Sequence, residues 1–178
     1  MPEPKPRLLS GPKLLEYALR VLTARAVSTG ELREKLRRRA ERASDIDETL
    51  ARLKDYGYLN DRRFAEGFAA SRLSNDKFGR GRVLRDLRQR RVAPALAEAT
   101  VRQVYQDVDE QALIEDWIRR KYRLAEREGL FRDDKDLAKA YARLLRAGFR
   151  TGEIVTALKK FAKNPELLDS FEPPEEEA

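Results

Sequence analysis

Two side chains that enzymes often use for catalysis are missing from this sequence, so that only metal-carboxylate, Lys, Tyr or Ser/Lys chemistry would remain for an enzyme. It contains no histidine and no cysteine, which excludes an imidazole base, a thiol nucleophile, a disulfide and a Cys/His zinc site. Carboxylates could still bind a metal ion, and Asp133, Asp134 and Asp136 are close in the sequence. Acids in such a position more often cap the start of a helix, which is the interpretation that we favour. We expect a non-enzymatic protein without a cofactor.

A glycine-rich stretch, Gly79-Arg80-Gly81-Arg82, could be taken for a phosphate-binding loop. It lacks the GxxxxGK[ST] spacing of such loops, and no strand is expected before it. We therefore do not expect this stretch to bind a nucleotide.

Positive charge is the chemical property that the sequence has in excess. Of the 38 basic and 31 acidic residues, six acids and no bases come after Asn164, so the preceding chain is strongly basic. A polyanion such as nucleic acid is the partner that this charge favours. A membrane surface is disfavoured because the bases recur along the whole chain and not on one amphipathic helix. With no run of about eighteen apolar residues and no signal-peptide core, we expect a cytoplasmic protein.

Arginines on three expected helices are the candidate contacts to DNA or to an acidic protein surface, because arginine suits bidentate contacts with phosphates and carboxylates. The candidates are Arg37, Arg38, Arg82, Arg85, Arg88, Arg120, Arg123 and Arg127. Around the first two, neighbouring glutamates make a merely solvated face equally plausible. Around Arg82, Arg85 and Arg88 only Asp86 opposes the positive charge, so we favour a polyanion contact there.

The elements that position these residues are predicted to be helices, because an apolar ladder with helical spacing occurs three times. Leu36, Leu87 and Leu144 are each followed by apolar residues at +10, +14 and +17. These rungs are Ile46, Leu50 and Leu53, then Ala97, Val101 and Val104, then Ile154, Leu158 and Phe161. No stretch alternates as a strand would.

The ends of several helices can also be predicted. Ser28 with Glu31 forms a capping box at the start of the second helix. Ser44 or Asp45 is expected to cap the third helix, and Gly57 to end it.

We therefore predict an all-α protein of three tandem three-helix repeats that form an elongated, curved array. The repeats are expected at residues 12–59, 60–107 and 108–163, after a loose N-terminus at 1–11 and before an acidic disordered tail at 164–178.

Aromatic residues gather where the first repeat meets the second. Tyr56, Tyr58, Phe64 and Phe68 lie among arginines and lysines, and such a group could stack on nucleic-acid bases. The other interpretation is that it forms the apolar seam between the two repeats. We favour the seam, because Phe64 and Phe68 share one face of a helix. Trp117 is likewise expected in the core, with Leu113, Ile114 and Leu124 on its face.

The stretch from Leu53 to Ala65, LKDYGYLNDRRFA, resembles the signature of the RecX family: a helix end, Gly-Tyr-Leu, and then Asn/Asp-Asp-x-x-Phe-Ala. Ser71-Arg72 and the stretch Gly79 to Arg88 are also similar to the family, and the resemblance covers roughly residues 14 to 162. The family favours glycine and a hydrophobic residue after the second helix of each repeat. Gly148-Phe149 fits, Arg91-Val92 keeps half of the pattern, and Ala40-Glu41 keeps none of it. The second helix of the first repeat is therefore expected to run longer or to end differently.

The resemblance implies a regulator that binds the RecA recombinase filament and its single-stranded DNA. It would inhibit filament assembly, ATP hydrolysis and strand exchange in homologous recombination, DNA repair and the SOS response, and we expect it to be a monomer. A sequence-nonspecific nucleic-acid-binding helical protein is the alternative, and it would bind nucleic acid tightly without RecA. A carboxylate-metal nuclease would require Mg²⁺-dependent cleavage and would leave the repeats unexplained.

Overall fold

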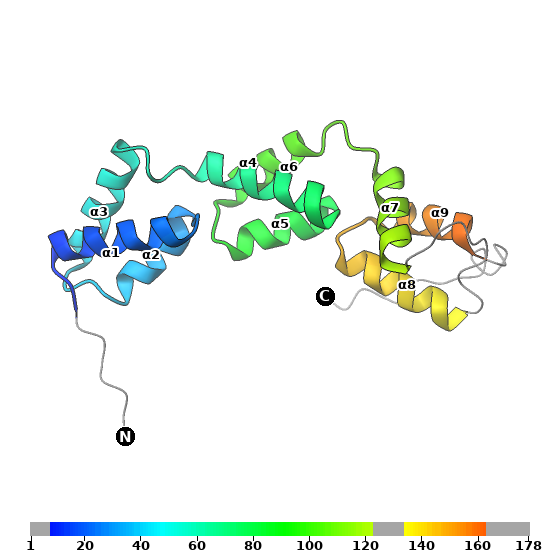
Figure 1. Cartoon of the computed structure of the whole chain (residues 1–178), viewed down its shortest axis with the longest axis horizontal. Helices are drawn as coiled ribbons and strands as arrows, with labels where there is room; N and C mark the ends of the chain where they lie inside the picture. The colour runs from blue at the N-terminus through cyan, green and yellow to red at the C-terminus, as the bar shows by residue number, and fades with distance from the viewer. Residues whose placement is uncertain (1–7, 123–133, 163–178) are drawn as a thin grey trace, which may run out of the picture. The chain divides into compact units, whose positions relative to one another are not determined.

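The protein is all-helical throughout the residues that its computed structural model describes, 8–122 and 134–162 (Figure 1). The helices are α1 Gly11–Ala24, α2 Thr29–Arg37, α3 Ala43–Asp55, α4 Asp61–Ser71, α5 Arg80–Gln89, α6 Pro94–Val104, α7 Glu110–Tyr122, α8 Asp134–Arg146 and α9 Thr151–Phe161. A short π-helical segment, Arg72–Asp76, follows α4. An isolated β-bridge joins Leu9 and Ala40. The predicted all-α class and three-helix repeats are confirmed.

The predicted helix ends are confirmed at two places and wrong at one. The Ser28 hydroxyl accepts the N–H of Glu31 at 3.0 Å, and the Glu31 carboxylate accepts the N–H of Ser28, so the capping box is complete. Gly57 follows the end of α3 with a φ of 73°, in the left-handed conformation that ends many helices. The predicted cap of α3 is wrong, because the helix already begins at Ala43. Asp45 therefore lies inside its first turn, where it is buried and pairs with Arg42 at 3.1 Å.

The apolar ladder forms the core. Leu36, Leu87 and Leu144 are equivalent in burial, each with an exposed fraction of 0%. The rungs at +10 and +14 are buried in all three repeats. At +17 only Leu53 is buried, whereas Val104 and Phe161 are half-buried.

The contacts within the chain define two compact units. Unit 1 comprises Met1–Phe68 and Asp86–Thr100, and unit 2 comprises Ala69–Arg85 and Val101–Ala178. The division passes through α4, α5 and α6, so the middle repeat contributes to both units. Repeat boundaries at 59/60 and 107/108 stay a prediction.

In unit 1, the start of α2 contacts the turn that follows α5. The Ser28 hydroxyl donates to the carbonyl of Arg90. Gly30 lies so close to Arg91 that a Cβ atom on it would come within 2.5 Å of the Arg91 carbonyl oxygen. Arg91 itself has a φ of 57°, a conformation that glycine adopts at the equivalent place in the third repeat. This contact, which we call the first joint, requires a residue without a side chain at position 30.

In unit 2, the start of α5 contacts the turn that follows α8 in the same manner. The N–H of Gly79 donates to the carbonyl of Ala147 at 2.8 Å, and the N–H of Gly81 to that of Gly148 at 3.1 Å. A Cβ atom on Gly148 would overlap the backbone of Arg82. The glycines of Gly79-Arg80-Gly81-Arg82 thus form this second joint, where close backbone packing explains their presence.

The corresponding turn of the first repeat ends differently, as expected. The N–H of Leu9 donates to the carbonyl of Arg39 at 2.6 Å, and the N–H of Glu41 donates to the carbonyl of Leu9 at 3.1 Å. At the first repeat, the hydrogen-bond donor to this turn is therefore Leu9, which precedes α1. At the two joints, the donor lies just before a helix: Ser28 before α2 and Gly79 before α5.

Replacing Leu87 with alanine is expected to lower the free energy of unfolding by about 2–5 kcal/mol, because it leaves a cavity at a fully buried site. Urea denaturation followed by circular dichroism measures the change. The exposed neighbour Gln89 provides the control, since Gln89→Ala should change the stability by less than about 0.5 kcal/mol. A loss of under about 1 kcal/mol for Leu87→Ala would contradict its place in the core.

Two glycine-to-alanine substitutions are expected to have opposite effects. Gly148→Ala should destabilise the fold by at least about 1–3 kcal/mol, the strain of a non-glycine residue at its φ of 93°, with the overlap at Arg82 in addition. Gly67 lies within α4 with no atom within 4 Å of a new Cβ, so Gly67→Ala should stabilise it by about 0.5–1 kcal/mol. Thermal melting compares the two variants. Equal shifts of the melting temperature would contradict the close packing of Gly148 at the second joint.

Candidate nucleic-acid and protein interface

The candidate arginines of unit 1 each have a carboxylate close by. Arg37 and Arg38 are exposed and lie 3.9 Å and 3.6 Å from Glu34, which are weak surface contacts. Arg88 forms a shorter ion pair of 2.8 Å with Glu98 of α6. The expectation that Asp86 alone opposes the charge of this helix is therefore wrong, because α6 supplies a further acid ten residues along the chain.

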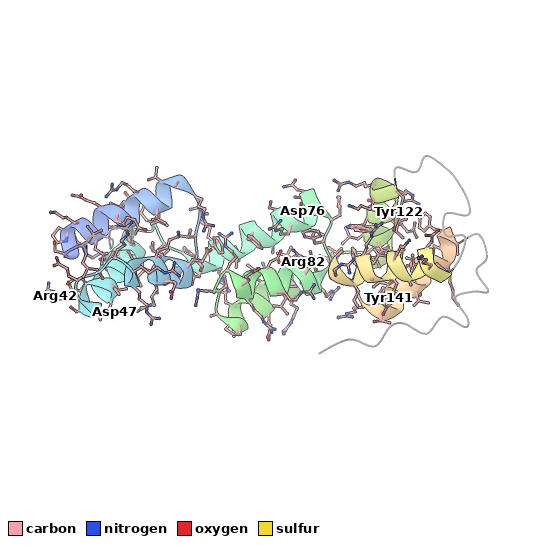
Figure 2. The ribbon with its side chains drawn as sticks, turned by 90° about the horizontal axis from the view of Figure 1, so that it is seen from below. Arg42, Asp47, Asp76, Arg82, Tyr122 and Tyr141 are labelled. Atoms are coloured by element: carbon pink, nitrogen blue, oxygen red, sulfur yellow. The ribbon has the colours of Figure 1, made fainter. Side chains whose placement is uncertain are left out.

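The candidates of unit 2 on α5 differ from each other. Arg82, labelled in Figure 2, is half-buried with its guanidinium 5.3 Å from the centre of the Phe78 ring. Arg85 is exposed and donates to the carbonyl of Arg146, the last residue of α8, at 3.2 Å. The partner of Arg85 is a neutral carbonyl, so this contact does not compensate its charge. Arg146 adds a second exposed cation at the same helix end. We call Arg85 and Arg146 the arginine pair.

The third group of candidates is described only in part. Arg120 is exposed on α7 and donates to the carbonyl of Asn75 at 3.2 Å. Arg123 and Arg127 lie outside the described residues. So does Asp133, whereas Asp134 begins α8 and Asp136 lies 3.8 Å from Lys139. Among the described residues no three potential ligands come together to hold a metal ion.

Several other arginines are held inside the fold. The Arg90 guanidinium lies over the rings of both Phe64 and Phe68, at 5.2 Å and 5.6 Å from their centres. It also pairs with Glu31 at 2.8 Å and donates to the carbonyl of Ala26. Phe64 and Phe68 are half-buried and stack on each other with their centres 6.0 Å apart. For these two rings the apolar seam between the first two repeats stays a prediction.

A second buried polar group supports unit 2. Arg80 pairs with the buried Glu110 at 2.7 Å, and the Tyr105 hydroxyl donates to the carbonyl of Phe78 at 2.7 Å. Burial, reinforced by the Glu110 carboxylate, raises the pKa of the Tyr105 hydroxyl well above its usual range. Tyr105 is therefore a neutral hydrogen-bond donor. Sequence reasoning missed this group, because its members are up to 32 residues apart.

The seam prediction is wrong for the two tyrosines. Tyr56 and Tyr58 have exposed fractions of 59% and 62%, whereas Leu53 and Leu59 on either side of them are buried. The two rings contact each other edge to face, with their centres 6.3 Å apart. Gly57 was the signal for this exposure, since residues beside a glycine helix stop lie in a surface turn. Trp117, which was expected in the core, is half-buried.

In the described part of the chain, the helices are too short or too polar to cross a bilayer.

Comparisons with known proteins place this geometry in a family. A family model described as "RecX, second three-helix domain" matches residues 60–101. The regulatory protein RecX of Deinococcus radiodurans is 36% identical over 162 residues, which cover 90% of this chain and 74% of the relative. The protein of the same name from Trichlorobacter lovleyi is 31% identical over 143 residues, covering 80% and 92%.

Solved structures show the same fold. The crystal structure of RecX from Lactobacillus salivarius has a TM-score of 0.63 at 21% identity, covering 90% of this chain and 97% of that one. A second crystal structure of a regulatory protein RecX also gives 0.63, at 16% identity, covering 83% and 71%. From its identity to the Deinococcus radiodurans relative over nine-tenths of its length, together with the domain match, the chain belongs to the RecX family of regulatory proteins.

Proposed function

We propose that this protein regulates the RecA recombinase. It binds the RecA filament on single-stranded DNA and inhibits filament assembly, ATP hydrolysis and strand exchange. The observation that carries the proposal is the family membership, at 36% identity over 90% of the chain. We propose regulation by binding; the sequence has no histidine or cysteine to supply an imidazole base or a thiol nucleophile.

The arginine pair is the part of the described surface that best fits a polyanion. Arg85 has a main-chain carbonyl as its partner, so contact with a phosphate would not first require breaking an ion pair. Arg120 is similar, with the carbonyl of Asn75 as partner. Arg88 fits less well, because Glu98 already pairs with it.

Sequence-nonspecific binding to nucleic acid is the alternative function, and the same exposed arginines favour it. The two functions differ in their dependence on RecA. A pull-down against purified RecA, with and without single-stranded DNA and nucleotide, separates them. The proposal expects capture that depends on the assembled filament, whereas capture by DNA alone with no gain from RecA supports the alternative.

Removing the charge of the arginine pair is expected to weaken the inhibition of RecA. In the variant Arg85→Gln with Arg146→Gln, both replaced side chains are exposed, so the fold should be kept. We expect strand exchange to require several-fold more protein for half-inhibition. If both arginines contact phosphates, the salt dependence of binding should fall by about 0.7 per lost contact on single strands.

The matched control is Arg102→Gln, which removes an exposed charge from α6 in the same unit. A folded double variant that inhibits strand exchange as well as the original chain at every salt concentration would show that the arginine pair is only a solvated surface.

A further inference from the structure

The turn between α3 and α4 holds its two tyrosines in a fixed, exposed position. The N–H of Gly57 donates to the carbonyl of Lys54 and that of Tyr58 to the carbonyl of Leu53, both at 2.9 Å. The N–H of Tyr56 donates to the carbonyl of Arg52 at 3.0 Å. The backbone of both aromatic residues is thus tied to the end of α3 before any ligand binds, so that little ordering entropy remains to be lost.

The exposure of the tyrosines is not explained by packing within the chain. Leu53 and Leu59 provide the buried contacts of this turn, and Gly57 between the tyrosines has space around it, since a Cβ atom added there would meet no atom within 4 Å. Among the described residues the only other large apolar side chain with comparable exposure is Leu8. Two adjacent exposed aromatic rings make this turn a candidate for contact with another molecule.

The side chains beside the rings indicate what that molecule is. Four exposed basic residues lie within five residues of one of the tyrosines: Arg52, Lys54, Arg62 and Arg63. Two acids, Asp55 and Asp61, belong to the same stretch, and Asp61 accepts the N–H of Thr29 at 2.6 Å. One of these basic residues, Arg62, has a carboxylate nearby: Glu66 lies 3.9 Å from its guanidinium. The surroundings of the rings therefore favour an anionic ligand.

From this arrangement we propose that Tyr56 and Tyr58 form a stacking site for unpaired bases of single-stranded nucleic acid, with the four basic residues beside them contacting its phosphates. Aromatic rings among cations suit such a strand, because each of its units combines a flat π-face with a negative charge. The faces of bases in a duplex are already stacked, so a duplex gains only the charge contacts. The proposal deepens the proposed function, since it assigns the surface that touches the strand.

The test measures the free chain with a fluorescein-labelled 15-nucleotide oligothymidylate by fluorescence anisotropy, without RecA. Replacing both tyrosines with alanine should raise the Kd about ten-fold or more, as expected for the loss of stacking. The slope of log Kd against log salt should stay the same, because no cation is removed. The matched variant with phenylalanine at both positions keeps the rings and should bind within about two-fold of the original chain.

Two further measurements make the result specific. Affinity for a blunt duplex of the same length should be unchanged by the alanine variant. Arg52→Gln with Lys54→Gln should lower the salt slope, as the removal of two phosphate contacts predicts. Circular dichroism should show that the variants are folded, which is expected because both tyrosines are exposed.

The proposal is overturned if the alanine variant binds the oligonucleotide like the original chain, or if single-strand and duplex affinities fall equally. It is also overturned if only capture of RecA is lost, since the turn would then be a protein contact. Failure of the proposed function looks different: the original chain would not inhibit RecA, while the effect of the tyrosines on DNA binding would persist.

Discussion

In each repeat, one main-chain carbonyl accepts the hydrogen bond that holds the repeat against an earlier segment of the chain. It lies three residues after the central leucine, on Arg39, Arg90 and Ala147, at or near the end of the repeat's second helix. The carbonyls at a helix end have no partner within the helix, and leaving one unsatisfied away from water is costly. Here the partners come from earlier in the chain: the N–H of Leu9, the hydroxyl of Ser28 and the N–H of Gly79. The close approach that these hydrogen bonds need explains the glycines at the two joints.

The helices and their core were predictable because they depend on local spacing. The ladder from Leu36, Leu87 and Leu144 and the capping box at Ser28 involve residues less than twenty apart. The joints were not predictable, because Gly30 and Arg91 or Gly79 and Ala147 meet only through the packing of distant segments. Asp45 shows that local prediction is also limited: the helix begins three residues earlier than a cap at Asp45 would require, so this residue forms a buried ion pair instead.

For the candidate interface, the sequence predicted the type of residue, arginine, but not which arginines are available to a partner. Composition indicated arginine as the candidate contact residue, but it could not separate arginines that build the fold from those that remain available. Arg90 lies between two phenylalanine rings and Glu31, and Arg80 pairs with the buried Glu110, whereas Arg85 rests on a carbonyl. The difference depends on neighbours that are 22 to 61 residues away in the sequence. Counting charges therefore overstates the number of cations that a polyanion can reach.

The pairing of Leu9 with Arg39 and Glu41 also bears on how copies of this protein meet. A repeat protein carries, at its first repeat, a surface that matches the start of its own later helices. Left open, such a surface would permit head-to-tail joining of one molecule to the next, a contact that repeats without closing and leads to fibres. In this chain Leu9 uses the carbonyl of Arg39 and the N–H of Glu41. Because Leu9 already satisfies both groups, they are not open to a hydrogen bond from another copy of the chain.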